Sequence, residues 1–228
     1  EMARVVVAKF DLAAGTRMSG SPMAQAILRA HATVYRLQQT TTPGWSTSSP
    51  FASRAVGWEA IAAVHLWREI EDRALAAAVR SHWRERWARV IGPAYRGKDV
   101  FDPRERDPRI FADGTGWMPW QQAVAAYGLD LAGRVFGEPE ACEIALRGAC
   151  YVVQHGFRQE GGRWISNKAV EVGGAGRIDP DNTFWLFGSP MAVELVRRRD
   201  PRDDRANSIW QQMVADAQHP HQVCWMPP

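Results

Sequence analysis

The segment from Trp117 to Phe157 predicts two consecutive helices joined by a tight turn. Gly137 and Pro139 mark the turn, because glycine readily ends one helix and proline suits the first turn of the next. Before it, apolar residues recur at helical spacing and share one face: Ala123, Val124, Tyr127, Leu131 and Val135. A second stripe of similar period follows it: Ala141, Ile144, Ala145, Gly148, Tyr151 and Val152. The segment is therefore predicted to be an α-hairpin.

Two further segments contain weaker versions of the same pattern, so the chain is predicted to repeat the helix pair. The three pairs are expected near residues 56–91, 119–156 and 183–218, and each begins with an aromatic-rich stretch. Stacked helix pairs bury one another's apolar faces, which explains why such a unit repeats along a chain. We therefore expect a mainly α fold of antiparallel helix pairs over residues 21–218.

The N-terminal part is expected to differ from the repeated pairs. Residues 1–20 are predicted to form an extended arm or strand, because Arg4–Leu12 is rich in β-branched residues. Ser21 then suits a helix cap, and Pro22 suits the first helical position. The apolar face of this first helix is expected to comprise the following residues: Ile27, Ala30, His31, Val34 and Leu37.

Two segments rich in glycine or proline are expected to lie outside the helix pairs. Residues 159–182 contain five glycines and predict a small β or irregular flap. Within it, residues 163–166 and 169–172 are expected to form a short β-hairpin. Residues 219–228 contain three prolines, and we expect them to form an extended tail.

Composition and charge exclude several classes of partner. Of the 228 residues, 46% are hydrophobic and 23% are charged, which is typical of a soluble globular protein. The net charge is only +3, and the basic run Arg197–Arg199 is followed by three aspartates, so we expect no nucleic-acid partner. No stretch approaches the roughly 20 apolar residues of a membrane span, so we expect no membrane partner. No signal peptide is visible, which favours a cytoplasmic location over secretion, although a processed N-terminus would leave no trace.

Cysteine and histidine spacing indicates neither a disulfide framework nor a metal site. The three cysteines are Cys142, Cys150 and Cys224, and small buried apolar positions explain them better than cross-links. His219, His221 and Cys224 are suitable zinc ligands, but a fourth ligand at a sensible spacing is missing. The glycine run at 173–176 lacks the lysine of a phosphate-binding loop. We therefore expect no metal and no cofactor.

The openings of the three helix pairs resemble those of the (α/α) toroid, or six-hairpin, superfamily of carbohydrate-active proteins. The resemblance is one of architecture, covers residues 54–218, and depends on the stretches Arg54-Ala55-Val56-Gly57-Trp58, Trp117-Met118-Pro119-Trp120-Gln121 and Asn182-Thr183-Phe184-Trp185. It implies a glycosidase- or lyase-like fold, to which the small β or irregular flap predicted from residues 159–182 is added. A closed ring of twelve helices needs a longer chain, so we expect a partial toroid, an open array or a piece of something larger.

In this superfamily the loops before the first helices face the cleft, and the catalytic candidates follow from that resemblance. Asp179 and Asp181 form a pair of carboxylates of the kind that glycoside chemistry requires. Alternatively, Asp181 or Asn182 caps the helix that begins near Thr183. His155 and Tyr151, one helical turn apart, are candidates for the base and acid of a lyase reaction. Alternatively, His155 simply complements the dipole at a helix C-terminus.

Aromatic and polar residues near the same helix starts are candidates for substrate binding: Trp117, Trp120, Gln121, Trp185, Glu59 and Trp45. Trp117 and Trp120 lie three positions apart, so they either form a stacking platform for sugar rings or pack against the neighbouring pair. Glu59 occupies the corresponding place in the preceding pair, either as an acid of the cleft or as a first-turn carboxylate. Trp45 lies in a long polar loop, and such loops are often functional.

Two functions are compatible with these features. The first is a carbohydrate-active protein, a glycoside hydrolase or polysaccharide lyase, whose partner is a glycan or another small polar substrate. The second is a non-catalytic helical scaffold or assembly subunit, for example of a virus particle, whose Trp and Arg faces contact other protein subunits. An exposed cleft lined by carboxylates would favour the enzyme, whereas surfaces that reach towards neighbouring chains would favour the scaffold.

Overall fold

The computed structural model describes residues 20–37, 52–98, 117–167, 169–170, 176–177 and 189–218. The predictions for the arm, the tail, Trp45, Asp179, Asp181 and Trp185 lie outside these ranges. The described part is mainly helical, as expected, with small two-stranded sheets. Its helices are α2 (Pro22–Arg36), α3 (Ala52–Glu69), α4 (Arg73–Arg86), a π-helical turn (Trp87–Ile91), α5 (Gly92–Tyr95), α6 (Pro119–Phe136), α7 (Pro139–His155), α8 (Ser189–Arg199) and α9 (Asp204–Gln218).

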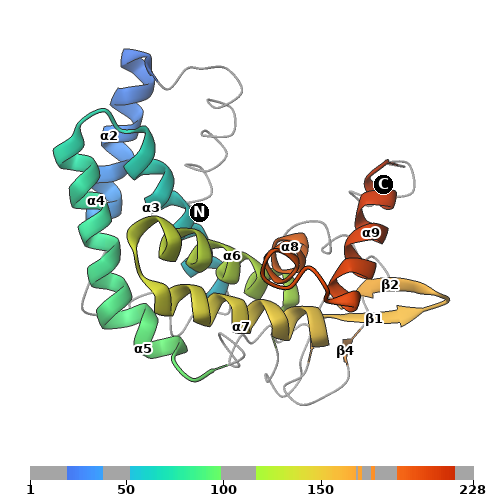
Figure 1. Ribbon diagram of the computed structural model, residues 1–228. Coiled ribbons are helices and arrows are strands. Elements are labelled where there is room, and N and C mark those ends of the chain that lie inside the picture. Colours follow the sequence, from blue (N-terminus) through green and yellow to red (C-terminus); the bar gives the residue numbers. More distant parts are fainter. Residues whose placement is uncertain are drawn as a thin grey trace.

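The helices pack as successive pairs (Figure 1). Helices α3 and α4 run antiparallel, as do α6 and α7, whereas α8 is seen end-on beside the lengthwise α9. The first helices of the three pairs are α3, α6 and α8, and they form one row. In this row α3 packs against α6, and α6 packs against α8. Each of them also packs against its own return helix, which is α4, α7 or α9. Helix α2 lies against α4 and α3 at one end of this row. The described helices therefore form an open array in which α6 is central.

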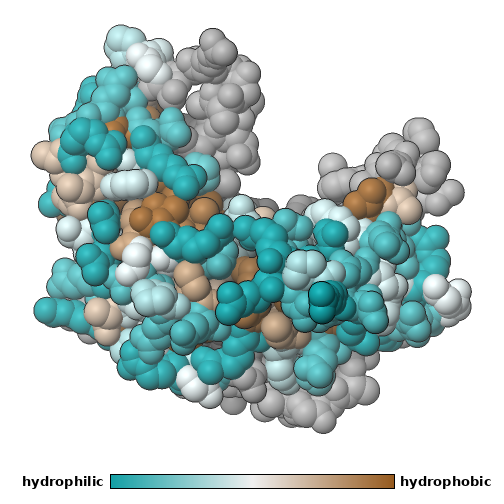
Figure 2. Space-filling view, in the orientation of Figure 1, coloured by the Kyte–Doolittle hydropathy of each residue, from teal (hydrophilic) through white to brown (hydrophobic). Residues whose placement is uncertain are grey.

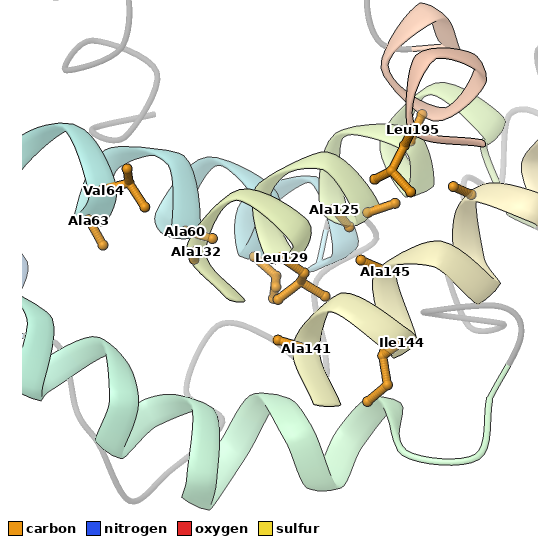
Figure 3. Close-up of a cluster of buried hydrophobic side chains, with 14 of the residues drawn as sticks. Ala60, Ala63, Val64, Ala125, Leu129, Ala132, Ala141, Ile144, Ala145 and Leu195 are labelled. Carbon is orange, nitrogen blue, oxygen red and sulfur yellow. The ribbon is translucent and has the colours of Figure 1, made fainter. Parts of the chain in front are cut away.

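Small residues allow the central helices to approach closely. A Cβ atom built on Gly57 of α3 would lie 2.4 Å from the carbonyl oxygen of Val124 on α6. The buried cluster around this crossing contains many alanines, and Figure 3 labels ten of its members: Ala60, Ala63, Val64, Ala125, Leu129, Ala132, Ala141, Ile144, Ala145 and Leu195. Short side chains bring the helix backbones close together, and larger residues fill the remaining space.

Capping residues fix several helix ends. The Ser21 hydroxyl accepts a hydrogen bond from the Ala24 amide at 3.1 Å, as the sequence predicted. The Asp72 carboxylate accepts one from the Leu75 amide at 3.0 Å and so begins α4. Gly137 ends α6 in the left-handed conformation, with φ 79°, where its missing Cβ avoids strain.

The expected apolar face of α2 is wrong. Its buried residues are Gln25, Leu28, Ala32 and Tyr35, whereas Val34 and Leu37 are exposed. Both sets have helical spacing, so periodicity alone does not distinguish them. The buried face is fixed by Gln25, whose amide donates to the Glu69 carbonyl at 2.9 Å and accepts from the Glu71 amide at 3.1 Å. A polar residue therefore anchors α2 to the α3–α4 turn.

The strand pairing expected in the flap is also wrong. Strand β2 (Arg163–Ser166) lies at the expected residues but pairs with β1 (Phe157–Glu160), antiparallel, rather than with 169–172. Gly161 and Gly162 form the turn with φ 56° and 77°, as a tight hairpin turn requires. The short strand β3 (Ala169–Val170) pairs instead with β4 (Gly176–Arg177). In the sequence, Gly161 and Gly162 are the signal for the turn between β1 and β2. The expected hairpin began only at residue 163, so it left this glycine pair out.

Candidate functional site

Several segments that are distant in the sequence meet at one end of the helix row. The end of α7 meets the start of α6, because a Cβ on Gly156 would lie 2.9 Å from the Pro119 side chain. Ser166 of β2 approaches Ser189 of α8, with 3.4 Å between their hydroxyl oxygens. We call this region the shared end. It is the part of the described structure in which most of the candidate residues lie.

Three of the predicted site residues form an aromatic row at the shared end. The rings of Trp117 and Tyr151 are 5.2 Å apart, and those of Tyr151 and His155 are 4.4 Å apart. Exposure increases along the row: Trp117 is only 1% exposed, Tyr151 is half-buried and His155 is exposed. Tyr151 and His155 thus lie in contact, as their spacing predicted, but Trp117 has no ring face open to a ligand in this conformation.

Polar contacts hold the exposed end of the row in place. The Asn167 amide donates to the His155 carbonyl at 3.2 Å, and its backbone N–H donates to the Gly156 carbonyl at 2.8 Å. Arg158 donates to the Asn167 side-chain oxygen. On the other side, Arg205 of α9 donates to the carbonyls of Val153, Gln154 and Phe157 at 2.8, 3.1 and 2.8 Å. Sequence reasoning did not identify Asn167 or Arg205, because their contacts join segments that are distant in the chain.

Trp120 and Gln121 occupy different environments. The Arg54 guanidinium lies over the half-buried Trp120 ring, 5.5 Å from its centroid. Gln121 is fully buried, and its amide donates only to the Met118 sulfur, at 2.8 Å. Its side-chain oxygen has no hydrogen-bond partner among the described residues, and neither has the Trp117 ring nitrogen. Of the two, only Trp120 has a partly accessible side chain.

Glu59 forms a buried ion pair with Arg86 between α3 and α4. Each side chain is about 2% exposed, and the guanidinium makes two hydrogen bonds to the two carboxylate oxygens. Burial raises the pKa of Glu59, and the Arg86 guanidinium opposes that rise. The pair therefore occupies the core between two helices, and neither group reaches solvent.

Two further polar side chains lie beside this ion pair. Tyr35 of α2 and His82 of α4 meet edge to face, with their ring centroids 5.0 Å apart. Burial raises the pKa of Tyr35 and lowers that of His82, where the Arg86 charge adds to the effect of burial. The Tyr35 hydroxyl and the His82 Nε2 have no hydrogen-bond partner among the described residues. In the sequence, the signal for this cluster is the presence of His82 and Arg86 on the apolar stripe of α4.

A separate candidate surface is the outward face of α2, which we call the α2 stripe: Met23, Ile27, Ala30, Val34 and Leu37. Leu37 is 77% exposed, Met23 is 69% exposed and Val34 is 38% exposed. These are the exposed large hydrophobic side chains of α2, and they lie opposite the face that packs on the body. Elsewhere the surface shown in Figure 2 is mostly hydrophilic, with apolar residues gathered where α3, α4 and α6 meet.

Neither a metal site nor a membrane-spanning helix is found among the described residues. In the part of the chain that the structure describes, no group of three or more His, Cys, Asp or Glu side chains is arranged to hold a metal ion. No described helix combines the length and the apolar character needed to cross a membrane.

Comparison with protein-family models, curated proteins and solved structures finds no match to this chain.

Proposed function

We propose that this chain is a non-catalytic helical scaffold that binds another protein subunit through the α2 stripe. One observation carries the proposal. Met23, Ile27, Ala30, Val34 and Leu37 follow one another at intervals of four, three, four and three residues, which is the heptad spacing of a helix that packs against a second helix. On α2 this spacing belongs to the face that is directed away from the body.

The fold does not need this face. Helix α2 is already anchored by the opposite face, where Leu28, Ala32 and Tyr35 are buried and Gln25 bonds to the α3–α4 turn. A surface helix normally has one apolar stripe, which faces the core. A second stripe exposes apolar area to water at about 25 cal/mol per Å², and contact with a partner would recover that cost.

The charges of α2 indicate the chemistry of the partner. Between Pro22 and Arg36 the helix contains Arg29 and Arg36 and no acidic residue. A second copy of the same helix would therefore bring like charges together, whereas a helix with acidic residues beside its apolar stripe would bring opposite charges together. The proposed partner is thus an amphipathic helix with acidic flanks.

A synthetic peptide tests this proposal. We would titrate the full chain into a fluorescent helical peptide of about three heptads, with leucine at the a and d positions and glutamate at the flanks. The proposal predicts saturable binding that weakens at higher salt, because the flanking charges are exposed. A matched peptide with lysine flanks should bind about tenfold more weakly. Equal binding of both peptides would contradict the proposed charge complementarity.

Two variants of the chain complete this experiment. Leu37→Glu places a like charge in the stripe and should weaken binding of the glutamate-flanked peptide about tenfold, or ~1.4 kcal/mol. Gln211→Glu is the control, because Gln211 is exposed on α9 and lies outside the stripe. If Gln211→Glu and Leu37→Glu weaken binding equally, the contact is a general charge effect and the α2 stripe is not the binding surface.

The carbohydrate-active interpretation is a second proposal, and one observation supports it. Tyr151 and His155 are in contact at the shared end, and the His155 side chain is exposed. A solvent-accessible histidine beside a phenol is suitable for acid–base chemistry. A glycan panel read by intrinsic tryptophan fluorescence would test it: a response that His155→Ala abolishes supports a glycan site, and no response to any glycan excludes it.

A further inference from the structure

A pocket of about 470 Å³ lies between α6, α7 and α8. Asp130 and Arg134 of α6 line one wall, and Arg198 and Arg199 of α8 line another. The first half of α7 contributes Pro139, Cys142, Glu143 and Leu146, and Leu195 of α8 completes the lining. The volume falls within the range of 300–1,000 Å³ that is typical of small-molecule sites. We call this cavity the arginine pocket.

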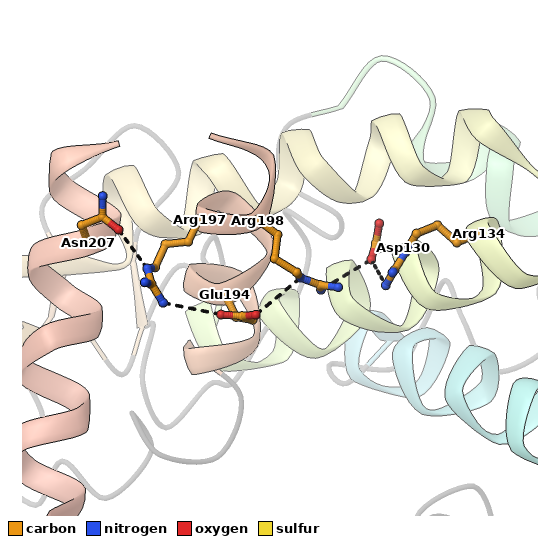
Figure 4. Close-up of polar contacts among 6 residues, drawn as sticks. All are labelled: Asp130, Arg134, Glu194, Arg197, Arg198 and Asn207. Atoms are coloured by element: carbon orange, nitrogen blue, oxygen red, sulfur yellow. Dashed lines mark hydrogen bonds and ion pairs between the residues drawn. The ribbon is translucent and has the colours of Figure 1, made fainter. Parts of the chain in front are cut away.

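One of the two carboxylates at the pocket, that of Asp130, is already neutralised. Figure 4 shows Asp130 between two guanidinium groups, with Arg134 at 2.6 Å and Arg198 at 3.8 Å from the same carboxylate oxygen. Arg198 also approaches Glu194, at 3.6 Å. The single Asp130 side chain is thus shared by two arginines. Its negative charge is therefore not available to repel an anion at the pocket.

Arg199 is the remaining cation of the pocket. Unlike Arg134 and Arg198, it has no ion pair or hydrogen bond from its side chain in the described structure. Glu143, on the α7 wall, is likewise unpaired, so the pocket residues comprise three arginines and two carboxylates. A guanidinium that borders a cavity and has no partner among the described residues is suited to bind a carboxylate or phosphate, because its planar N–H groups match two oxygens at once.

The rest of the lining is apolar. Leu195 is buried and Leu146 is half-buried, and Pro139 and Cys142 continue this surface along α7. Burial raises the pKa of the Cys142 thiol, whose sulfur lies 3.7 Å from the Asp130 carbonyl oxygen, so the side chain is neutral and adds no charge. A ligand that occupies this volume therefore needs an apolar body as well as a charged group.

We infer that the arginine pocket binds a small organic anion, with its charged group at Arg199 and its apolar body against Leu146 and Leu195. The anionic group is a carboxylate or a phosphate ester, and both groups bond to guanidinium in the same bidentate way. This site is independent of the α2 stripe, which belongs to a different part of the fold. The scaffold would then bind a small ligand in addition to a protein partner.

A series of ligands with one constant tail tests the inference. We would measure binding of hexanoate, hexyl phosphate, hexylamine and hexanol to the full chain by calorimetry. In parallel, mass spectrometry would follow alkylation of Cys142, with the exposed Cys150 as the internal reference. We expect hexanoate or hexyl phosphate to bind and to slow alkylation of Cys142 at least threefold without affecting Cys150. Binding of one anion but not the other identifies the charged group.

Two variants connect the binding to Arg199. Arg199→Ala should weaken binding of the anion at least fivefold, whereas Arg202→Ala, an exposed arginine outside the pocket, should leave binding unchanged. Thermal melting of both variants would verify that they fold. If hexanol or hexylamine binds as tightly as hexanoate, or if neither anion protects Cys142, the inference is overturned.

Discussion

Gly57 of α3 and Gly128 of α6 are in backbone contact at the centre of the helix row. A Cβ built on Gly128 would lie 2.3 Å from the carbonyl oxygen of Gly57, a separation that real side chains do not adopt. A Cβ on Gly57 would clash with the backbone of Val124, and a Cβ on Gly128 would clash with the backbone of Gly57. Because the atoms that would clash belong to the backbone, no side-chain rotation can relieve either clash. The distance between α3 and α6 is therefore set by the absence of two side chains.

Substituting Gly57→Ala should therefore destabilise the protein. Although alanine favours a helix, the added methyl group forces α3 away from α6, and such overpacking costs about 1–3 kcal/mol or more. Chemical denaturation would measure the change. Gly20→Ala is the matched control, because a Cβ there meets only Glu71, at 4.0 Å, and its stability should be nearly unchanged. Equal stability of the two variants would contradict the close crossing.

The Glu59–Arg86 pair leads to a second prediction. Replacing Arg86 by methionine should cost about 3–5 kcal/mol, because it leaves the Glu59 carboxylate buried without a counter-charge. The double variant Glu59→Leu/Arg86→Met should be more stable than Arg86→Met, since it removes both charges. Denaturant midpoints of the wild type and the variants would show this order. A double variant no more stable than Arg86→Met would mean that the carboxylate is not the source of the loss.

His82 should make stability depend on pH. Burial and the Arg86 charge lower its pKa in the folded state, so below about pH 6.5 the unfolded chain binds a proton that the folded chain does not. Stability should therefore fall as the pH decreases from 7.5 to 5.5. His82→Phe keeps an aromatic ring beside Tyr35 and should reduce this dependence. The same slope in the wild type and in His82→Phe would exclude His82 as its cause.

The positions of several helix ends could be predicted from the sequence, because the causes of a helix end are local. Ser21 and Gly137 fix helix ends through the conformation of a few neighbouring residues, and these positions agree with the structure. The contact of Tyr151 with His155 was also predictable, since both lie one turn apart on the same helix.

Long-range contacts could not be predicted in this way. The choice between the two apolar faces of α2 depends on Gln25, whose partners lie 44 and 46 residues away. Glu59 and Arg86 belong to different helices, and neither position alone shows that the other compensates its charge. Trp117 has the spacing of a stacking platform, but its packing against Tyr151 places it in the core. Spacing defines a face, whereas the neighbouring element decides whether that face is buried.

Arg205 should be more important for stability than an ordinary surface arginine. Its guanidinium donates to three carbonyls around the end of α7 and lies 4.5 Å from the Trp164 ring centroid. Arg205→Lys retains the charge but cannot reproduce this fork, so we expect a loss of about 1–3 kcal/mol. Chemical denaturation would measure this loss. The control variant Arg202→Lys should lose almost no stability. A similar loss at both positions would contradict the role of Arg205 in holding the end of α7.

Methionine oxidation tests the central proposal, an uncovered apolar stripe on α2 that binds a protein partner. Met23 is 69% exposed on that stripe, whereas Met118 and Met213 are buried. With dilute peroxide and peptide mapping by mass spectrometry, we predict rapid oxidation of Met23 and slow oxidation of the two buried methionines. The glutamate-flanked peptide should slow oxidation of Met23. If Met23 in the free chain is as protected as Met118, another part of the chain covers the stripe and the proposed docking surface does not exist.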